Sequence, residues 1–261
     1  MSPIRFDLLK EIFVALLWVA LAVGTGILSI GAAEKQHHGT VLSVDYDLLH
    51  LTDGNDLITV DEIKDKILSV FEFDLVGLEI EYLDIQYVEK VLKDEAFIVD
   101  ADAYLDRHNV LHIDLKQRTP ILRVMDFQGN NYYVDAEGVK LPLSENFTAR
   151  VPVITGVPMT HDDFDSGKTQ LCQVYRLIRY VRNDPFLNAW LEEVHVPREG
   201  EMVLIGNIGK FPVIIGDAQE LEEKLNKLKV FFQHGQEEVN WNKLESIDLR
   251  FATQVVTKRK Q

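Results

Sequence analysis

The sequence contains few cysteines and few basic side chains, and each shortage excludes a class of function. Cys172 is the only cysteine, so neither an intramolecular disulfide nor a zinc site built from cysteines can form. The 261 residues carry 42 acidic and 27 basic side chains, a formal net charge of −15. Because nucleic-acid binding depends on neutralising phosphates with Lys and Arg, this balance argues against a nucleic-acid partner.

Motifs that carry catalysis or metal binding are also missing. The sequence has neither the H-E-x-x-H helix of zinc peptidases nor the G-x-S-x-G turn of serine hydrolases. The run 167–169, Gly-Lys-Thr, resembles the end of a phosphate-binding loop, but Asp162 stands where that loop needs its first glycine. His108 and His112 flank a predicted turn and strand, so they would not share a helix face. We therefore predict no catalytic residue, no cofactor and no metal site.

Acidic residues are concentrated in one part of the chain. Residues 39–106 hold 18 Asp and Glu against four Lys, a net charge of −14, whereas residues 107–261 hold 21 acidic and 20 basic side chains. This break near residue 107 indicates two units or one acidic face. Such a face is usually a solvated surface, although it would also attract a basic partner.

An uncharged apolar segment near the start predicts a membrane helix. Residues 12–33 contain no charge and would span roughly 33 Å as a helix, enough for a hydrocarbon core of about 30 Å. Arg5 and Lys10 precede the segment, so residues 1–11 are expected in the cytoplasm and the rest of the chain in the periplasm. Two alternatives stay open: a signal peptide cleaved near residues 31–33, and a buried core helix.

The next part of the chain, residues 34–120, predicts a small α+β domain. Apolar and polar residues alternate over 42–48, as in a strand with one buried face. A capping-box pattern at 59–62 begins a helix, and apolar residues at helical spacing over 85–92 predict a second. Strands are expected over 96–104 and 111–116, and Pro120 closes the domain. This β-α-α-β-β order is typical of a POTRA-like module.

The remaining chain, residues 121–256, predicts a mixed β-domain with two helices. A hairpin is expected over 122–134 and a short strand over 151–155. Helices are expected over about 168–182 and from 221, because apolar residues recur there in one stripe. Three strands between 189 and 216 and a last strand over 246–251 complete an α+β architecture. Residues 257–261 are expected to form a basic C-terminal tail.

Four stretches in this order make the chain resemble the bacterial FtsQ/DivIB cell-division family, in a form similar to its Bacteroidetes branch. They are LHIDLKQRTP at 111–120, YYVDAEG at 132–138, VPVITG at 151–156 and SIDLRF at 246–251. The resemblance covers nearly the whole chain: a short cytoplasmic start, one membrane helix, a POTRA domain and a β-domain.

The resemblance implies a non-catalytic divisome scaffold in the inner membrane at the division septum. It implies FtsB-like and FtsL-like bitopic proteins as partners, with a septal peptidoglycan synthase as a further candidate. FtsB would add as a strand at the C-terminal edge, at the matching positions Ser246, Ile247, Asp248, Leu249, Arg250 and Phe251 and the following residues, among them Gln254 and Val255. Arg118 and Pro120 would lie at the domain junction. Ser246 replaces the tyrosine common in the family, so an aromatic anchor is missing there or is supplied by Phe251 or Trp241.

Two other interpretations of the function stay open beside the divisome scaffold. The chain could be another POTRA-bearing protein that serves transport or outer-membrane assembly, a class that usually repeats the module or continues into a barrel. It could also be a tethered periplasmic enzyme, which would need a cleft with perturbed carboxylates or histidines.

Overall fold

The computed structural model describes Trp18 and residues 39–157, 169–234 and 241–260. None of the helices within these ranges is both long and apolar enough to cross a bilayer. The predicted membrane segment 12–33 lies outside the described residues except for Trp18, so it stays a prediction. The described chain forms two compact units, residues 39–49 with 60–116, and residues 50–59 with 117–260. The short segments 50–59 and 117–120 thus belong with the second unit.

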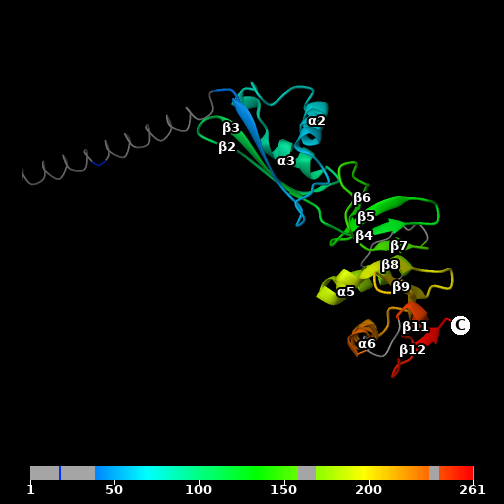
Figure 1. Ribbon diagram of the computed structural model, residues 1–261. Helices are drawn as coiled ribbons and strands as arrows, with labels where there is room; N and C mark the ends of the chain where they lie inside the picture. The colour runs from blue at the N-terminus through cyan, green and yellow to red at the C-terminus, as the bar shows by residue number, and fades with distance from the viewer. Residues whose placement is uncertain (1–17, 19–38, 158–168, 235–240, 261) are drawn as a thin grey trace, which may run out of the picture. The chain divides into compact units, whose positions relative to one another are not determined.

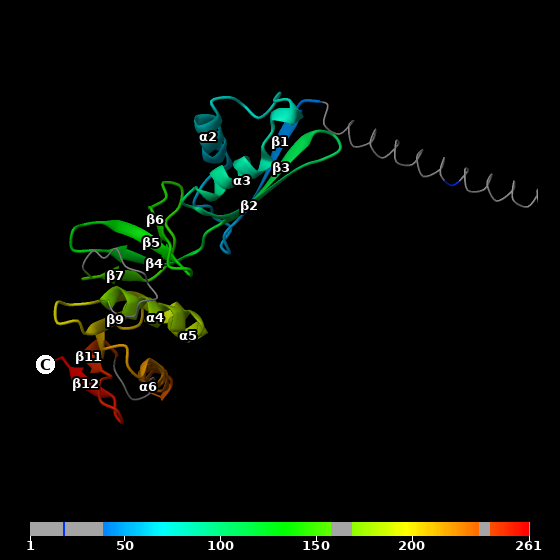
Figure 2. The same ribbon diagram turned by 180° about the vertical axis from the view of Figure 1, so that it is seen from behind.

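The first unit has the predicted β-α-α-β-β order. Its elements are β1 (Ser43–Leu49), α2 (Val60–Phe71), a 3₁₀ turn (Ile80–Tyr82), α3 (Ile85–Lys93), β2 (Ile98–Leu105) and β3 (Val110–Gln117). The sheet order is β1-β3-β2, with β1 parallel to the central strand β3. Figures 1 and 2 show α2 and α3 covering one face of this sheet.

Local sequence explains these elements. In β3 the side chains of Leu111, Ile113 and Leu115 are buried and alternate with more exposed polar ones, which places one face of the strand against the helices. The α3 helix is capped by Asp84, the residue before it, whose carboxylate accepts a hydrogen bond from the Tyr87 N–H at 3.0 Å.

The second unit is built on a nine-stranded sheet in the order β12-β11-β10-β9-β8-β7-β4-β5-β6. Its elements are β4 (Pro120–Met125), β5 (Asn131–Asp135), β6 (Lys140–Leu141), β7 (Val153–Thr155), α4 (Gln170–Arg182), α5 (Pro185–Trp190), β8 (Leu191–His195), β9 (Met202–Gly206), β10 (Pro212–Gly216), α6 (Leu221–His234), a 3₁₀ turn (Trp241–Lys243), β11 (Leu244–Asp248) and β12 (Val256–Arg259). The mixture of parallel and antiparallel pairs with flanking helices confirms the α+β class.

A short helix replaces the beginning of one predicted strand. Residues 189–196 were expected to be extended, but α5 continues to Trp190 and β8 begins only at Leu191. The cause is local, because the Asp184 carboxylate caps the N–H groups of Phe186 and Leu187 at 3.0 Å and a proline follows it at the first helical position. The described part of this unit therefore has three helices, not two.

The expected last strand is shorter than predicted and is followed by another. β11 ends at Asp248, after which the Leu249 N–H donates to the Ile214 carbonyl at 2.8 Å and the chain turns. It returns as β12, so residues 257–259 of the expected basic tail are part of the last strand.

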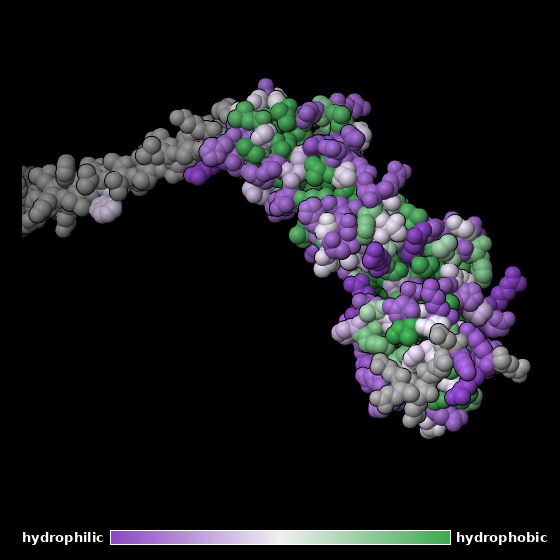
Figure 3. All heavy atoms as spheres, in the orientation of Figure 1, coloured by the Kyte–Doolittle hydropathy of each residue, from purple (hydrophilic) through white to green (hydrophobic). Residues whose placement is uncertain are grey.

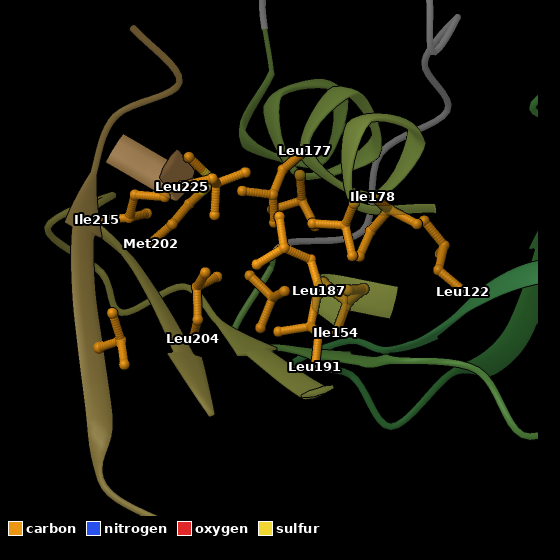
Figure 4. Packing of buried hydrophobic residues seen from close by; sticks show 14 of the residues in the cluster. Leu122, Ile154, Leu177, Ile178, Leu187, Leu191, Met202, Leu204, Ile215 and Leu225 are labelled. Atoms are coloured by element: carbon orange, nitrogen blue, oxygen red, sulfur yellow. The ribbon is translucent and has the colours of Figure 1, made fainter. Parts of the chain in front are cut away.

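The core of the second unit lies between the sheet and its helices. Figure 4 shows Leu177 and Ile178 of α4 pointing toward the sheet residues Ile154 and Leu204, with Leu225 of α6 beside them. All five side chains are fully buried. Burying aliphatic side chains at about 25 cal/mol per Å² is the main term that holds such a sheet and its helices together.

Candidate interaction surface

The open edge of the nine-stranded sheet at its C-terminal end is β12. One side of β11 pairs with β10 and the other with β12, so the backbone of residues 246–248 is already covered by the protein's own strands. β12 stands last in the sheet order, and all four of its residues are exposed. Figure 1 shows it in red beside β11, near the C-terminus. An added strand at this end would therefore pair with β12.

The direction of the β12 backbone groups follows from one hydrogen bond. The Lys260 N–H donates to the Lys243 carbonyl at 2.8 Å, toward β11. Successive N–H groups of a strand point to opposite sides, and Lys258 stands opposite Ser246. The N–H of Lys258 therefore points to β11, whereas that of Thr257 points to the open side.

The segment between β11 and β12 is fixed by a lysine of α6. Lys227 Nζ donates to the carbonyl oxygens of Leu249, Phe251 and Ala252 at 3.4, 2.6 and 3.2 Å. Val255 packs against the core, and the Phe251 side chain is 46% exposed. The turn thus holds an aromatic ring at the surface beside the open strand.

Arg250 is held by two carboxylates of the same unit. Its Nη2 lies 2.6 Å from Asp248 Oδ2 and its Nη1 lies 2.8 Å from Glu201 Oε1. The hydrogen bonds from the Arg250 side chain, with a further one from its backbone N–H, hold the pKa of Asp248 below its usual range. Arg250 would have to leave these partners, or share them, to pair with a carboxylate of another protein.

The predicted partner-binding residues fall into two groups. Ile247 and Leu249 are fully buried, and Ser246 and Asp248 are partly buried in β11. The side chains of Arg250, Phe251 and Gln254 are exposed, and Val255 is partly so. The whole set remains a prediction for partner binding, and Ile247 and Leu249 are the members whose side chains do not reach the surface.

Several residues of this surface are not evident from the sequence pattern. They are Thr257, Lys258 and Arg259 of β12, the lysine at 227 and the glutamate at 201. In the sequence, Lys258 and Arg259 resemble a solvated tail. Charged side chains are also usual in edge strands, so these two residues were the feature of the sequence that could have indicated a strand here. Lys258 Nζ pairs with Glu245 Oε1 across the strands at 2.5 Å.

The two residues expected at the domain junction belong to the second unit. Arg118 Nη1 donates to Asp135 Oδ2 at 2.9 Å, and the Asp135 side chain is almost completely buried. Pro120 begins β4 and stands opposite Asp135 in the register. The ion pair thus joins the start of β4 to the end of β5.

No group of three or more metal-binding side chains occurs within the described ranges. A groove of about 700 Å³ lies at the start of β4 and β8, where Arg150, Arg182 and Glu192 are its charged lining residues. This lining has neither a histidine nor a pair of carboxylates, the groups that acid–base catalysis uses most often.

Comparisons with known proteins single out the region that contains this surface. The family model described as "FtsQ/DivIB, C-terminal related" matches residues 119–258, from the start of β4 into β12. The cell division protein FtsQ of Salinibacter ruber is 28% identical over 157 residues, which cover 57% of this chain. The aligned part spans 59% of the length of that relative.

Proposed function

Because the chain belongs to the FtsQ/DivIB family, we propose that it is a non-catalytic scaffold of the bacterial divisome. The match over residues 119–258 is the observation that carries this proposal, since it covers the second unit except the loop 50–59, residues 117–118 and the last residues. The scaffold would link early and late proteins of septum assembly through its outer units.

The proposed location is the inner membrane at the division septum. The uncharged segment 12–33 would span the bilayer once, with residues 1–11 in the cytoplasm and the two units in the periplasm. The first unit, with its β-α-α-β-β order, would be the POTRA domain of this scaffold.

The proposed partners are FtsB-like and FtsL-like bitopic proteins, with a septal peptidoglycan synthase as a further one. The open edge of β12 supports recruitment by strand addition, because its outward N–H and C=O groups can pair with an extended segment of another chain. Phe251, exposed beside that edge, would supply an apolar contact. The contact surface would therefore include residues 250–259.

The test is capture of the FtsB-like and FtsL-like proteins of the same organism by the full chain in detergent. Thr257→Pro removes one of the two outward N–H groups of β12, the other being that of Arg259, and leaves the inward donors in place, whereas Thr257→Ala keeps every backbone donor. We expect capture to fall about tenfold, roughly 1.4 kcal/mol, with Thr257→Pro and to persist with Thr257→Ala. Equal capture by both variants would exclude strand addition at β12, and no capture by the unaltered chain would exclude these partners.

A further inference from the structure

The first unit carries an apolar groove far in sequence from the surface described above. It has a volume of about 200 Å³ and is lined by Val44 and Tyr46 of β1, by Lys64, Asp65, Ile67 and Leu68 of α2, and by Phe73, Asp74, Leu75 and Val76 of the following loop. Three of the apolar lining residues are unusually exposed: Leu68 at 51%, Phe73 at 46% and Val76 at 46%. Figure 3 shows hydrophobic side chains at the surface of this unit. Contiguous exposed apolar side chains of this kind mark binding sites.

The groove runs beside an open strand edge. β1 pairs with β3 on one side and stands at the end of its sheet. On its other side the described chain covers only the approach to the strand, through the Thr40–Glu79 bridge and the hydrogen bond from the Val41 N–H to the Leu78 carbonyl at 2.9 Å. From Val44 to Leu48 no strand of the described residues lies along that side. A peptide added there would continue the sheet and place alternate side chains over the groove.

The charges around the groove indicate the chemistry of the peptide. Asp65 and Asp74 line it, and Asp45 and Asp47 project from the same strand. Lys64, the basic lining residue, is already paired with Asp61 at 3.2 Å. Burial and the nearby Asp74 carboxylate raise the pKa of Tyr46 to about 12, so its hydroxyl stays neutral and the charge of the groove comes from the carboxylates and Lys64. A groove of this kind favours Lys or Arg beside the apolar anchors.

The same charges argue against a second copy of this chain as the occupant. Pairing two β1 edges would bring the carboxylates of Asp45 and Asp47 of both copies close together in a sheet. Like charges at short range across strands destabilise the pair, and charged edge strands are a known device against self-association. The edge is therefore suited to a partner of opposite charge.

We propose that the β1 edge and the adjoining groove bind an extended peptide segment in which apolar side chains alternate with Lys or Arg. The apolar side chains occupy the space between Tyr46, Leu68 and Phe73, the basic ones face the surrounding carboxylates, and the peptide backbone pairs with β1. This site is independent of the partner surface at β12.

The experiment uses the full chain in detergent micelles and a labelled seven-residue peptide of alternating Lys and Val. Binding is measured by fluorescence anisotropy, and backbone hydrogen exchange locates the contact. We expect saturable binding that protects the amides of Asp45 and Asp47, whose N–H groups point away from β3, and at least about tenfold weaker binding of the matched peptide with Glu in place of Lys. Binding of both peptides with equal affinity, or protection that appears on β2 or β12 instead, would overturn the proposal.

Two variants separate the groove from general surface charge. Phe73→Asp and Leu68→Asp each place a carboxylate where an apolar anchor should lie, and both are expected to weaken binding at least about tenfold. Tyr82→Asp is the control, because Tyr82 is 69% exposed and does not line the groove. Thermal melts that match the unaltered chain show that each variant is folded. If both groove variants failed that check, the exchange map of the unaltered chain would decide. Equal affinity in all three folded variants would refute the site.

Discussion

The side chain of Gln117 binds the backbone of Leu57, sixty residues earlier in the chain. Gln117 Oε1 accepts a hydrogen bond from the Leu57 N–H at 2.8 Å, and its Nε2 donates to Asp56 Oδ1 at 2.7 Å. Ser144 Oγ donates to the Leu57 carbonyl, so both polar groups of this buried peptide are satisfied. These bonds explain why the loop 50–59 belongs with the second unit although β1 and α2, on either side of it, belong to the first.

Gln117→Ala should destabilise the second unit. The change leaves a buried N–H without its acceptor, which costs about 1–3 kcal/mol. For a unit of this size each kcal/mol lowers the melting temperature by about 2–4 °C. Thermal unfolding followed by circular dichroism measures the effect, with Gln128→Ala as the control because Gln128 is exposed in a turn. A melting temperature equal to that of the control would show that water replaces the lost acceptor.

Arg118→Met should destabilise the hairpin of β4 and β5. The Asp135 carboxylate is buried and would keep only its backbone donors, the N–H groups of Glu137 and Val139 at 3.0 and 2.7 Å. Removing one partner of a buried ion pair costs about 3–5 kcal/mol, and somewhat less where the arginine is partly exposed, as here.

Urea denaturation of three variants tests this ion pair. Arg118→Lys should lie between the Met variant and the unaltered chain, since it keeps the charge but loses the planar donors. Adding Asp135→Asn to Arg118→Met should recover part of the loss, because it removes the unpaired charge. If Arg118→Met leaves the urea midpoint unchanged, the ion pair contributes nothing to stability.

The elements that could be predicted from the sequence are those with a pattern of apolar and polar residues within a short stretch of chain. Alternation in β3, the capping-box pattern at the start of α2 and the helical spacing of apolar residues in α3 identify the first unit, since burial there follows periods of 2 and 3.6 residues. α5 escapes prediction because its six residues are too few to show a helical period. β12 could not be predicted either, because all its residues are exposed and its sequence therefore shows no alternation of apolar and polar residues.

The candidate surface depends on contacts between distant residues. Arg250 meets Glu201 across 49 residues, and Lys227 meets the carbonyl of Phe251 across 24. No spacing in the sequence encodes such pairs, because they arise from the pairing of β10 with β11 and the packing of α6. The motif at 246–251 therefore lies next to the open edge of the sheet, but it does not identify β12 as the strand at that edge.

The contribution of Asp248 to stability should disappear in acid. Its pKa in the folded protein is lowered by the hydrogen bonds from Arg250, whereas the unfolded chain should have the ordinary value of about 3.9. The folded state therefore binds protons less readily. The stabilisation is complete above the unfolded value and is lost as the pH falls through the folded one.

The unfolding free energy of the unaltered chain and of Asp248→Asn, compared from about pH 6 to about pH 2, isolates this group from other carboxylates. The difference between the two should be largest near pH 6 and should shrink below about pH 4. A difference that is constant across this range would mean that the charge of Asp248 is not what stabilises the turn.

Gly206→Ala should destabilise the core beneath β9. A Cβ at this position would lie 2.0 Å from Cε2 of Trp190, a large side chain that is only 2% exposed. Overpacking of this kind costs about 1–3 kcal/mol, because the ring must leave its preferred rotamer or the strand must shift. Trp190→Phe should relieve the clash, since the smaller ring lacks the atoms nearest to the new methyl group.

The Trp190→Phe variant also removes the Trp190 Nε1–H, which has no hydrogen-bond partner within the described residues. In a double-mutant cycle of unfolding free energies, we expect the Phe background to reduce the cost of Gly206→Ala by at least half. An undiminished cost in that background would show that the glycine is required by its backbone rather than by the contact with the ring.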